Sequence, residues 1–244
     1  MATTGFIFLA ADFEQIEFRI YGQLSGDPTL LSVLKQEDDV FTKLSSIWQD
    51  KEIKEVTMDD REKTKRMVYA IMYGAGKNKM AEILGTSVVQ AANIMELFFK
   101  HFSVFRSFYR NVISEAQQSG YLTTMFGRRR YFPQINSGNV LIRSQTERQA
   151  FNFLIQGSAA DIAKAALIQA EAKLATEGVD SHLVLMIHDE IVWEVRDADF
   201  TSATAIVRSS LQDTQSLSAG KVKFNVPFPV KLKSGKKWNS LVVL

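Results

Sequence analysis

The chain has 244 residues, of which 46% are hydrophobic and 23% are charged, a balance typical of a globular protein and not of a disordered one. It has no cysteine, which excludes a disulfide framework, a thiolate metal site and a cysteine nucleophile. Its three histidines are too few for most histidine-rich metal clusters, and a net charge of +2 predicts no particular partner by itself. No apolar stretch approaches the roughly 18 residues that cross a bilayer, so we expect no membrane partner.

The hydrophobic pattern predicts an α+β protein. Residues 5–11 are short, apolar and aromatic, as expected of a buried strand that ends at an acidic residue. Helical patterns follow from about Pro28, and the largest of them cover residues 61–73, 80–120 and 143–177, the last interrupted at Gly157. The pair Thr57 and Asp60 predicts an N-cap for the first of these helices.

The end of the chain alternates between strands and one helix. Strands are expected at residues 183–187 and 191–195, a helix at about 200–211, and a last extended segment in the alternating run 222–226. The helical insertion, at about residues 28–125, would form its own lobe, and the flanking pieces would pair in one antiparallel sheet.

A basic segment suggests a polyanion or phosphate contact. Residues 121–150 hold five arginines against one glutamate, in a chain that is nearly neutral overall. Taken alone, a solvated charged face is the commoner explanation of such a segment.

Two carboxylates follow apolar strands, Asp12 after the first and Asp189 after the segment 183–187. Carboxylates at the ends of adjacent strands can hold Mg²⁺, which binds one or two carboxylates together with waters and phosphate oxygens. Two such ions about 4 Å apart would stabilise both the attacking and the leaving oxygen of a phosphoryl transfer. For either residue alone, a turn or strand-end cap is the commoner role.

Two helices carry polar side chains at every fourth position, so each set lies along one helix face. The first set suits a nucleotide, with cations for the phosphates and rings for the sugar or base: Arg61, Lys65, Tyr69 and Tyr73. The second set offers hydrogen-bond donors in a line, as needed to follow a DNA groove or backbone: Arg148, Asn152 and Gln156. Taken alone, an amphipathic helix with a solvated polar stripe is the commoner explanation of either set.

Together these motifs resemble those of the family A DNA polymerases, the bacterial DNA polymerase I family. The segment Asp12-Phe-Glu-Gln-Ile-Glu-Phe-Arg19 is similar to the family's Asp-Tyr-Ser-Gln-Ile-Glu-Leu-Arg motif. The family's fingers helix, palm helix and third motif are matched in order by Arg61 to Gly74, Arg148 to Asp161 and His188-Asp189-Glu190. Several stretches look most like the eukaryotic polymerase nu branch, with theta next.

The resemblance implies a right-hand polymerase palm at residues 1–28 and 126–244, an antiparallel sheet with helices, that carries a helical fingers insertion at 29–125. The chain starts just before the first motif, so we expect the thumb and any exonuclease domain to be absent and an upstream thumb segment to be required. The family reaction is template-directed DNA synthesis from dNTPs on a primer–template. The expected setting is DNA repair or translesion synthesis in the nucleus.

The resemblance also implies roles for single residues. Asp12 and Asp189 would hold two Mg²⁺ ions, and Glu190 would support this site from its edge. Lys65 would grip the triphosphate together with Arg61 and protonate the leaving pyrophosphate. The remaining nucleotide contacts would come from Tyr69, from Gln15, and from Glu17, which would exclude a 2′-hydroxyl. Primer and template would be held by Tyr73, Arg148, Asn152, Gln156 and His188.

Two departures from the family pattern are visible. Glu14 stands where serine is usual, and we expect it to point away from the ions. Tyr69-Ala70 replaces the commoner Phe-Gly. In this family, tyrosine at the first of these positions is associated with easier acceptance of dideoxynucleotides.

Two alternatives remain beside this interpretation, and a third is set aside. A phage-type single-subunit RNA polymerase shares the carboxylate pair and the fingers helix, but Glu17 and Glu190 argue against it. A non-catalytic, DNA-binding remnant is the alternative from another functional class. A histidine-metal phosphohydrolase is set aside, because His188-Asp189 lacks the further histidines that such a site needs.

Overall fold

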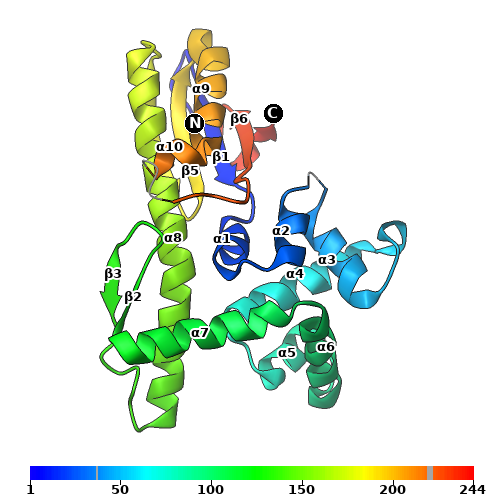
Figure 1. The fold of residues 1–244 in the computed structure, drawn as a ribbon. Coiled ribbons are helices and arrows are strands. Elements are labelled where there is room, and N and C mark those ends of the chain that lie inside the picture. The colour runs from blue at the N-terminus through cyan, green and yellow to red at the C-terminus, as the bar shows by residue number, and fades with distance from the viewer. Residues whose placement is uncertain (37, 219–221) are drawn as a thin grey trace. The chain divides into compact units, whose positions relative to one another are not determined.

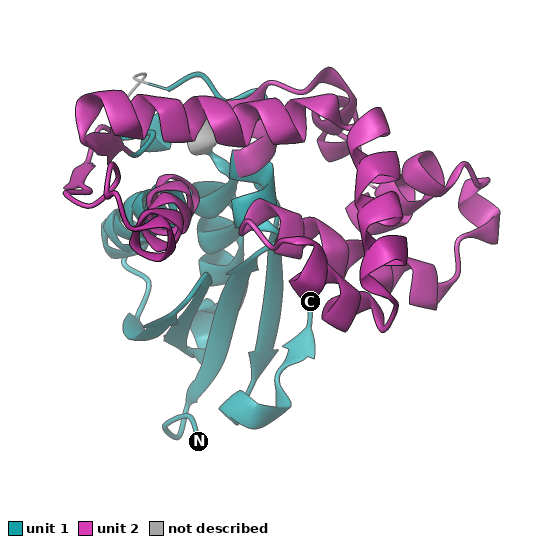
Figure 2. Cartoon of the chain, turned by 90° about the horizontal axis from the view of Figure 1, so that it is seen from below, with its two compact units in different colours: residues 1–20, 124–126, 156–244 teal, residues 21–123, 127–155 magenta. Residues whose placement is uncertain are grey.

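The computed structural model describes residues 1–36, 38–218 and 222–244. Contacts divide the chain into two compact units (Figure 2): unit 1 holds residues 1–20, 124–126 and 156–244, and unit 2 holds residues 21–123 and 127–155. The division assigns residues 127–155 to the helical unit, whereas the expected boundary at residue 125 groups them with the sheet. The assignment of palm and fingers stays a prediction.

Unit 1 is built on a five-stranded sheet in the order β4-β5-β1-β6-β7, in which every neighbouring pair is antiparallel (Figure 1). The strands are β1 (Phe6–Phe13), β4 (Ser181–Ile187), β5 (Glu190–Arg196), β6 (Val230–Gly235) and β7 (Val242–Val243). The expected strands at 5–11, 183–187 and 191–195 are therefore present, in one sheet, and the α+β class is confirmed.

The central strand is buried on both faces. Leu9, Ala10 and Ala11 of β1 have no exposed surface. Leu9 lies opposite Trp193 of β5, whose indole nitrogen donates to Glu171 Oε1 on helix α8 (Val140–Thr176) at 2.6 Å. Helix α9 (Phe200–Gln212) also runs along the sheet. Successive side chains of a strand point to opposite faces of the sheet, so Asp12 lies on the same face as Ala10.

The alternating run 222–226 carries no strand, and its burial alternates as the sequence pattern predicts. Phe224 and Val226 are buried, and the last long strand among the described residues is β6. Pro227 and Pro229 follow the run and carry no N–H to donate to a ladder. Alternation here reflects the burial of one face of an extended segment.

Helix α8 continues through Gly157, so the predicted interruption of this helix is wrong. A glycine costs a helix only about 1 kcal/mol relative to alanine, and strong helix formers flank it on both sides. Residues 140–155 of this helix belong to unit 2 and residues 156–176 to unit 1.

The remaining elements are mostly helices. Those that lie wholly or partly in unit 2 are α1 (Ile16–Ser25), α2 (Pro28–Leu34), α3 (Val40–Gln49), η1 (Ile53–Glu55), α4 (Met58–Met72), α5 (Lys77–Leu84), α6 (Val88–His101), α7 (Ser103–Ser119) and the hairpin β2 (Tyr121–Thr123) with β3 (Arg129–Tyr131). The short elements of unit 1 are η2 (Asp197–Asp199), α10 (Thr214–Leu217) and η3 (Trp238–Ser240). Among the described helices, none is long and apolar enough to cross a membrane.

The core of unit 2 is aromatic. Phe98 of α6, Phe105 of α7 and Phe102 between these helices contact one another edge-on or tilted, with ring centroids 4.7–6.2 Å apart. Tyr21 stacks on Phe105 at 4.3 Å and donates its hydroxyl to the carbonyl of Phe105 at 3.0 Å. This buried hydrogen bond fixes the orientation of a ring that would otherwise bury an unpaired hydroxyl.

The predicted start of the helix that carries Arg61 is confirmed. Thr57 accepts from the backbone N–H of Asp60, and the Asp60 carboxylate accepts from the backbone N–H of Thr57, which is a capping box at the start of α4. Burial alone would raise the pKa of Asp60, but hydrogen bonds from Thr57 and from the Lys51 ammonium at 3.0 Å lower it to about 2.

The capping carboxylate gives the first prediction. Asp60→Asn should lower the free energy of unfolding at pH 7 by about 1 kcal/mol, allowing for solvent screening of the exposed Lys51. Because the folded pKa lies below the unfolded one, the wild-type advantage is complete above about pH 4 and disappears as the pH falls toward 2. Urea unfolding between pH 7 and pH 2.5 measures it. Asp59→Asn is the control, and an equal loss there would contradict the prediction.

Candidate active site

Four predicted site residues lie where the central strands end. Asp12 is near the end of β1 and lies directly opposite Glu190, the first residue of β5. His188 and Asp189 form the two-residue turn between β4 and β5. The backbone N–H of Phe13 donates to the carbonyl of Asp189 at 3.4 Å, which holds the turn against β1.

The turn itself is locally unfavourable. His188 has φ of 54°, in the left-handed region that glycine or asparagine usually occupies. Such a conformation costs on the order of 1–2 kcal/mol and persists because the flanking strand pairs enforce it. The pairing of β4 with β5 therefore positions both the imidazole and the neighbouring carboxylate of Asp189.

The carboxylates repel one another. Burial, followed by the charge of Asp189, raises the pKa of Asp12 above its ordinary value, and Glu190 and Glu14 add to this effect. Glu14 has the smallest of these effects. Lys233 opposes the rise, because its ammonium lies 3.1 Å from Glu190 Oε2 and 3.9 Å from Asp12 Oδ2.

Lys233 is a residue that the sequence analysis missed. It lies on β6, two strands away from Glu190 across the central strand, and its position opposite Ala10 places it on the same sheet face as Asp12. The only sequence signal was a lysine within an alternating strand pattern. The indole nitrogen of Trp238 also donates to Glu190 Oε1, at 3.4 Å.

The carboxylates of Asp12 and Asp189 suit a Mg²⁺ ion that also binds water and phosphate better than a metal ion enclosed by protein ligands alone. Among the described residues, no group of three or more His, Asp or Glu side chains is arranged to hold a metal by itself. Asp12 and Asp189 are two close carboxylates whose mutual repulsion a cation would relieve, and Mg²⁺ needs only one or two carboxylates when waters and phosphate oxygens complete its shell. Glu190 is already bound by Lys233, which suits a residue at the edge of such a site.

A cavity of about 470 Å³ within unit 1 lies beside these residues. It is lined by Glu17 of α1, Gln156 of α8, and His188 and Asp189 of the turn. Burial raises the pKa of Glu17, while a hydrogen bond to Gln156 lowers it. Four of the predicted nucleotide, DNA and metal residues therefore share one cavity.

The turn from β1 into α1 positions Glu17. Gln15 has φ of 51°, which turns the chain sharply after the strand. Arg19 is buried and donates to the carbonyls of Glu14 at 2.9 Å and Pro227 at 3.0 Å. Arg19 is the last residue of the first motif, and these hydrogen bonds show that it stabilises the turn.

The predicted nucleotide-binding residues on α4 lie in unit 2. The Arg61 guanidinium donates to both carboxylate oxygens of Asp39, at 2.9 and 2.8 Å, and also binds Glu62. Burial would raise the pKa of Asp39, but the hydrogen bonds from Arg61 and Thr42 lower it. Lys65 forms no ion pair with any described residue. Its ammonium is thus the better placed of the two to bind a new anion.

Tyr69 and Tyr73 are stacked, with ring centroids 6.4 Å apart and planes 20° apart. Tyr73 and Arg148 line a second cavity, of about 440 Å³, within unit 2. Gly74 lies between them, and a Cβ there would be 3.4 Å from the Arg148 side chain. Asn152, one turn further along α8, has a buried Oδ1 with no hydrogen-bond partner among the described residues.

The predicted site residues thus fall into two groups. Unit 1 holds Gln15, Asp12, Glu17, Gln156, His188, Asp189 and Glu190. Unit 2 holds Arg61, Lys65, Tyr69, Tyr73, Arg148 and Asn152. Arg148, Asn152 and Gln156 all lie on the continuous helix α8. Their individual roles stay predictions.

Comparisons with known proteins identify what the chain is similar to. The model of the family described as DNA polymerase family A matches residues 1–240. DNA polymerase theta of Drosophila melanogaster is 37% identical over 237 residues, which is 94% of this chain and 11% of that protein. DNA polymerase I of Bacillus caldotenax is 34% identical over 95% of this chain and 26% of its own length.

A solved structure is similar over almost the whole chain. It is described as the POL domain of Pol1 from M. smegmatis in complex with DNA primer-template and dNTP. The TM-score is 0.91 at 33% sequence identity, and the match covers 98% of this chain and 41% of that one. The chain thus spans about a tenth to a quarter of these curated relatives.

The ion pair of Arg61 gives the second prediction. Arg61→Ala should lower the free energy of unfolding by about 1 kcal/mol, because it frees the Asp39 carboxylate that caps α3. Arg61→Lys should recover less than half of this loss, since an ammonium cannot bind both oxygens in the same fork. The exposed Arg66 is the control, and its replacement by alanine should change stability by less than about 0.5 kcal/mol. Full rescue by lysine in urea unfolding would contradict the assignment.

Proposed function

Because this chain belongs to DNA polymerase family A, we propose that it carries the nucleotidyl-transfer centre of template-directed DNA synthesis. The chain spans only part of its relatives, so the activity, substrates and partners of a whole polymerase are proposed for it. The observation that carries the proposal is the meeting of Asp12 and Asp189 at the sheet end, beside the cavity that Glu17 and Gln156 line.

In this proposal a primer 3′-hydroxyl attacks the α-phosphate of a dNTP. A bond forms between the 3′-oxygen and phosphorus, the bond to the leaving pyrophosphate breaks, and the hydroxyl proton passes to solvent water. Asp12 and Asp189 would hold two Mg²⁺ ions, which supply positive charge for the attacking and leaving oxygens when bound. Catalysis of this kind consists mainly of positioning and charge stabilisation.

The other residues act on the nucleotide and DNA. Lys65, which has no ion-pair partner among the described residues, binds the triphosphate and donates a proton to the pyrophosphate. Tyr69 packs against the incoming nucleotide, and Gln15 and Arg61 complete its site. Arg61 must exchange part of its bond with Asp39 to do so. The residues proposed to hold primer and template are Tyr73, Arg148, Asn152, Gln156 and His188.

A role in DNA repair or translesion synthesis, and a nuclear location, are further parts of the proposal. They rest on the resemblance to the polymerase nu and theta branch, and a theta relative is among the similar proteins. The upstream thumb segment is proposed as a partner that keeps the primer–template aligned. The family assignment disfavours a phage-type RNA polymerase.

The third prediction tests the carboxylates. Primer extension with Mg²⁺ is measured for this chain alone and for this chain joined to the segment that precedes the corresponding region of a bacterial DNA polymerase I. The joined polypeptide should extend much faster. Asp12→Asn and Asp189→Asn should each lower its rate by at least about 10³-fold, because each removes a full negative charge from the metal site.

Asp197→Asn is the matched control, because this carboxylate pairs with Lys236 elsewhere in unit 1. It should leave extension unchanged. DNA binding without extension in both polypeptides would support the non-catalytic, DNA-binding alternative and would refute the proposed activity.

The fourth prediction concerns Glu17. A carboxylate held by Gln156 in the cavity can exclude a 2′-hydroxyl by its bulk and leave a deoxyribose untouched. Glu17→Ala should raise ribonucleotide incorporation relative to deoxynucleotide incorporation by at least about tenfold, or about 1.4 kcal/mol of lost discrimination. Specificity constants for both nucleotides, in wild type and variant of the joined polypeptide, measure it. Glu14→Ala is the control, and an unchanged ratio in Glu17→Ala would remove Glu17 from the sugar site.

A further inference from the structure

A third cavity lies within unit 2, away from the residues assigned above to catalysis. It has a volume of about 290 Å³ and opens between the end of α4, helix α6 and helix α7, which Figure 1 labels. Its lining combines aromatic rings with arginines: Phe99, Arg106, Tyr109 and Arg110. The volume is at the small end of the range for ligand sites, which suits one planar group and not a whole nucleotide.

The two arginines of this cavity are in different electrostatic states. Arg106 lies over the ring of Phe99, 4.5 Å from its centroid, and pairs with Glu96 at 2.5 Å. Its charge therefore already has a partner, and its guanidinium lies over Phe99 as part of the wall. Arg110 is exposed and forms no ion pair with any described residue. The cavity thus has a fixed stacking surface and one cation available to an anionic ligand.

The cavity adjoins the one that Tyr73 and Arg148 line. Gly74 and Ala75 belong to both linings, so the turn after α4 separates the two cavities. Gly74 has φ of 75°, and a Cβ there would be 3.7 Å from the Tyr109 hydroxyl. A DNA strand that passes Tyr73 can therefore reach the third cavity around a turn in which Gly74 has no side chain and Ala75 has only a methyl group.

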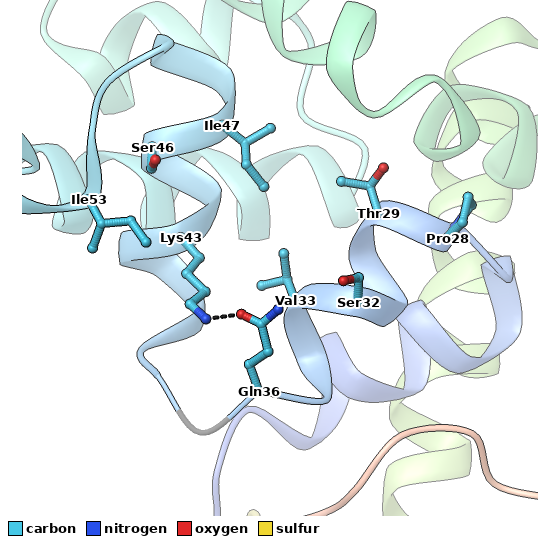
Figure 3. Close-up of a pocket in the computed structure, with 9 residues that line it drawn as sticks. All are labelled: Pro28, Thr29, Ser32, Val33, Gln36, Lys43, Ser46, Ile47 and Ile53. Carbon is cyan, nitrogen blue, oxygen red and sulfur yellow. Dashed lines mark hydrogen bonds between the residues drawn. The ribbon is translucent and has the colours of Figure 1, made fainter.

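A larger cavity of unit 2 lacks the two features that the third cavity has. It measures about 540 Å³ between α2, α3 and η1, and Figure 3 shows Lys43 donating to Gln36 there. Lys43 also pairs with Asp38 at 2.6 Å, and no aromatic residue lines this cavity. It therefore offers neither a free cation nor a stacking surface.

We propose that the cavity between α6 and α7 binds one unpaired base of a single-stranded DNA segment, with Arg110 on the adjacent phosphate. Unpaired bases stack on aromatic rings and on guanidinium planes, and the cavity offers both in Phe99, Tyr109 and Arg106. This inference extends the proposed function, because it assigns the unpaired template strand a binding site beyond Tyr73.

The test separates contacts to bases from contacts to phosphates. Fluorescence anisotropy of the 244-residue chain compares (dT)₈ with an eight-residue strand of abasic sugar-phosphates. The wild type should bind (dT)₈ more tightly. Phe99→Leu should weaken the binding of (dT)₈ by about tenfold and leave the abasic strand unaffected. Leu97→Ala, an exposed apolar residue of the same helix outside the cavity, is the control and should change neither.

Arg110→Ala should weaken both strands alike and reduce the slope of log K against log salt by about 0.7, the value for one phosphate contact on a single strand. Lys54→Ala, which also removes one exposed positive charge from unit 2, should leave the slope unchanged. Because Arg110 is exposed, Arg110→Ala tests the proposal even if Phe99→Leu lowers stability. Circular dichroism checks that each variant is folded.

Two outcomes separate this inference from the proposed function. If Phe99→Leu and Arg110→Ala bind both strands as the wild type does, and the joined polypeptide still extends a primed template, the inference is wrong and the polymerase proposal stands. If the wild-type chain binds neither strand and the joined polypeptide extends no primer, both are wrong.

Discussion

The repulsion among carboxylates at the end of the central strand is the constraint on which the candidate site depends. Asp12, Asp189 and Glu190 lie close together because β1 pairs with β5 and the turn before β5 holds His188 in a left-handed conformation. Lys233 offsets part of the repulsion, and a bound cation would offset more. Burial in the rest of the sheet stabilises the fold against this repulsion, because the middle residues of β1 are completely buried.

In unit 2, contacts that hold the fold together are made by residues close in sequence to those that line the cavities. Asp39 caps α3 and binds Arg61, so one carboxylate joins a helix start to the helix that carries Tyr69 and Tyr73. The aromatic core of α6 and α7 buries Phe98 and Phe105, and Phe105 lines the same cavity as the less buried Phe99. A substitution in this part of unit 2 can lower both stability and ligand binding, so the two must be measured separately.

Much of the fold could be predicted from local signals. The capping pair Thr57 and Asp60, the apolar strand before Asp12 and the two strands around His188 are where the pattern placed them, because capping and burial of a short apolar run are decided by neighbouring residues. The pattern failed at Gly157, because the cost of one glycine is outweighed by the strong helix formers on both sides of it.

The sequence by itself determined the family, since four motifs in order name the residue types and their spacing, and the family model matches them from residue 1 to 240. Only the tertiary structure decided which charges meet. Lys233 reaches Glu190 across two strand pairs, Arg61 turns to Asp39, and Gln156 binds Glu17 from a different helix. The physical reason is that sheet register and helix packing bring together residues up to about 220 positions apart, and no local pattern encodes those contacts.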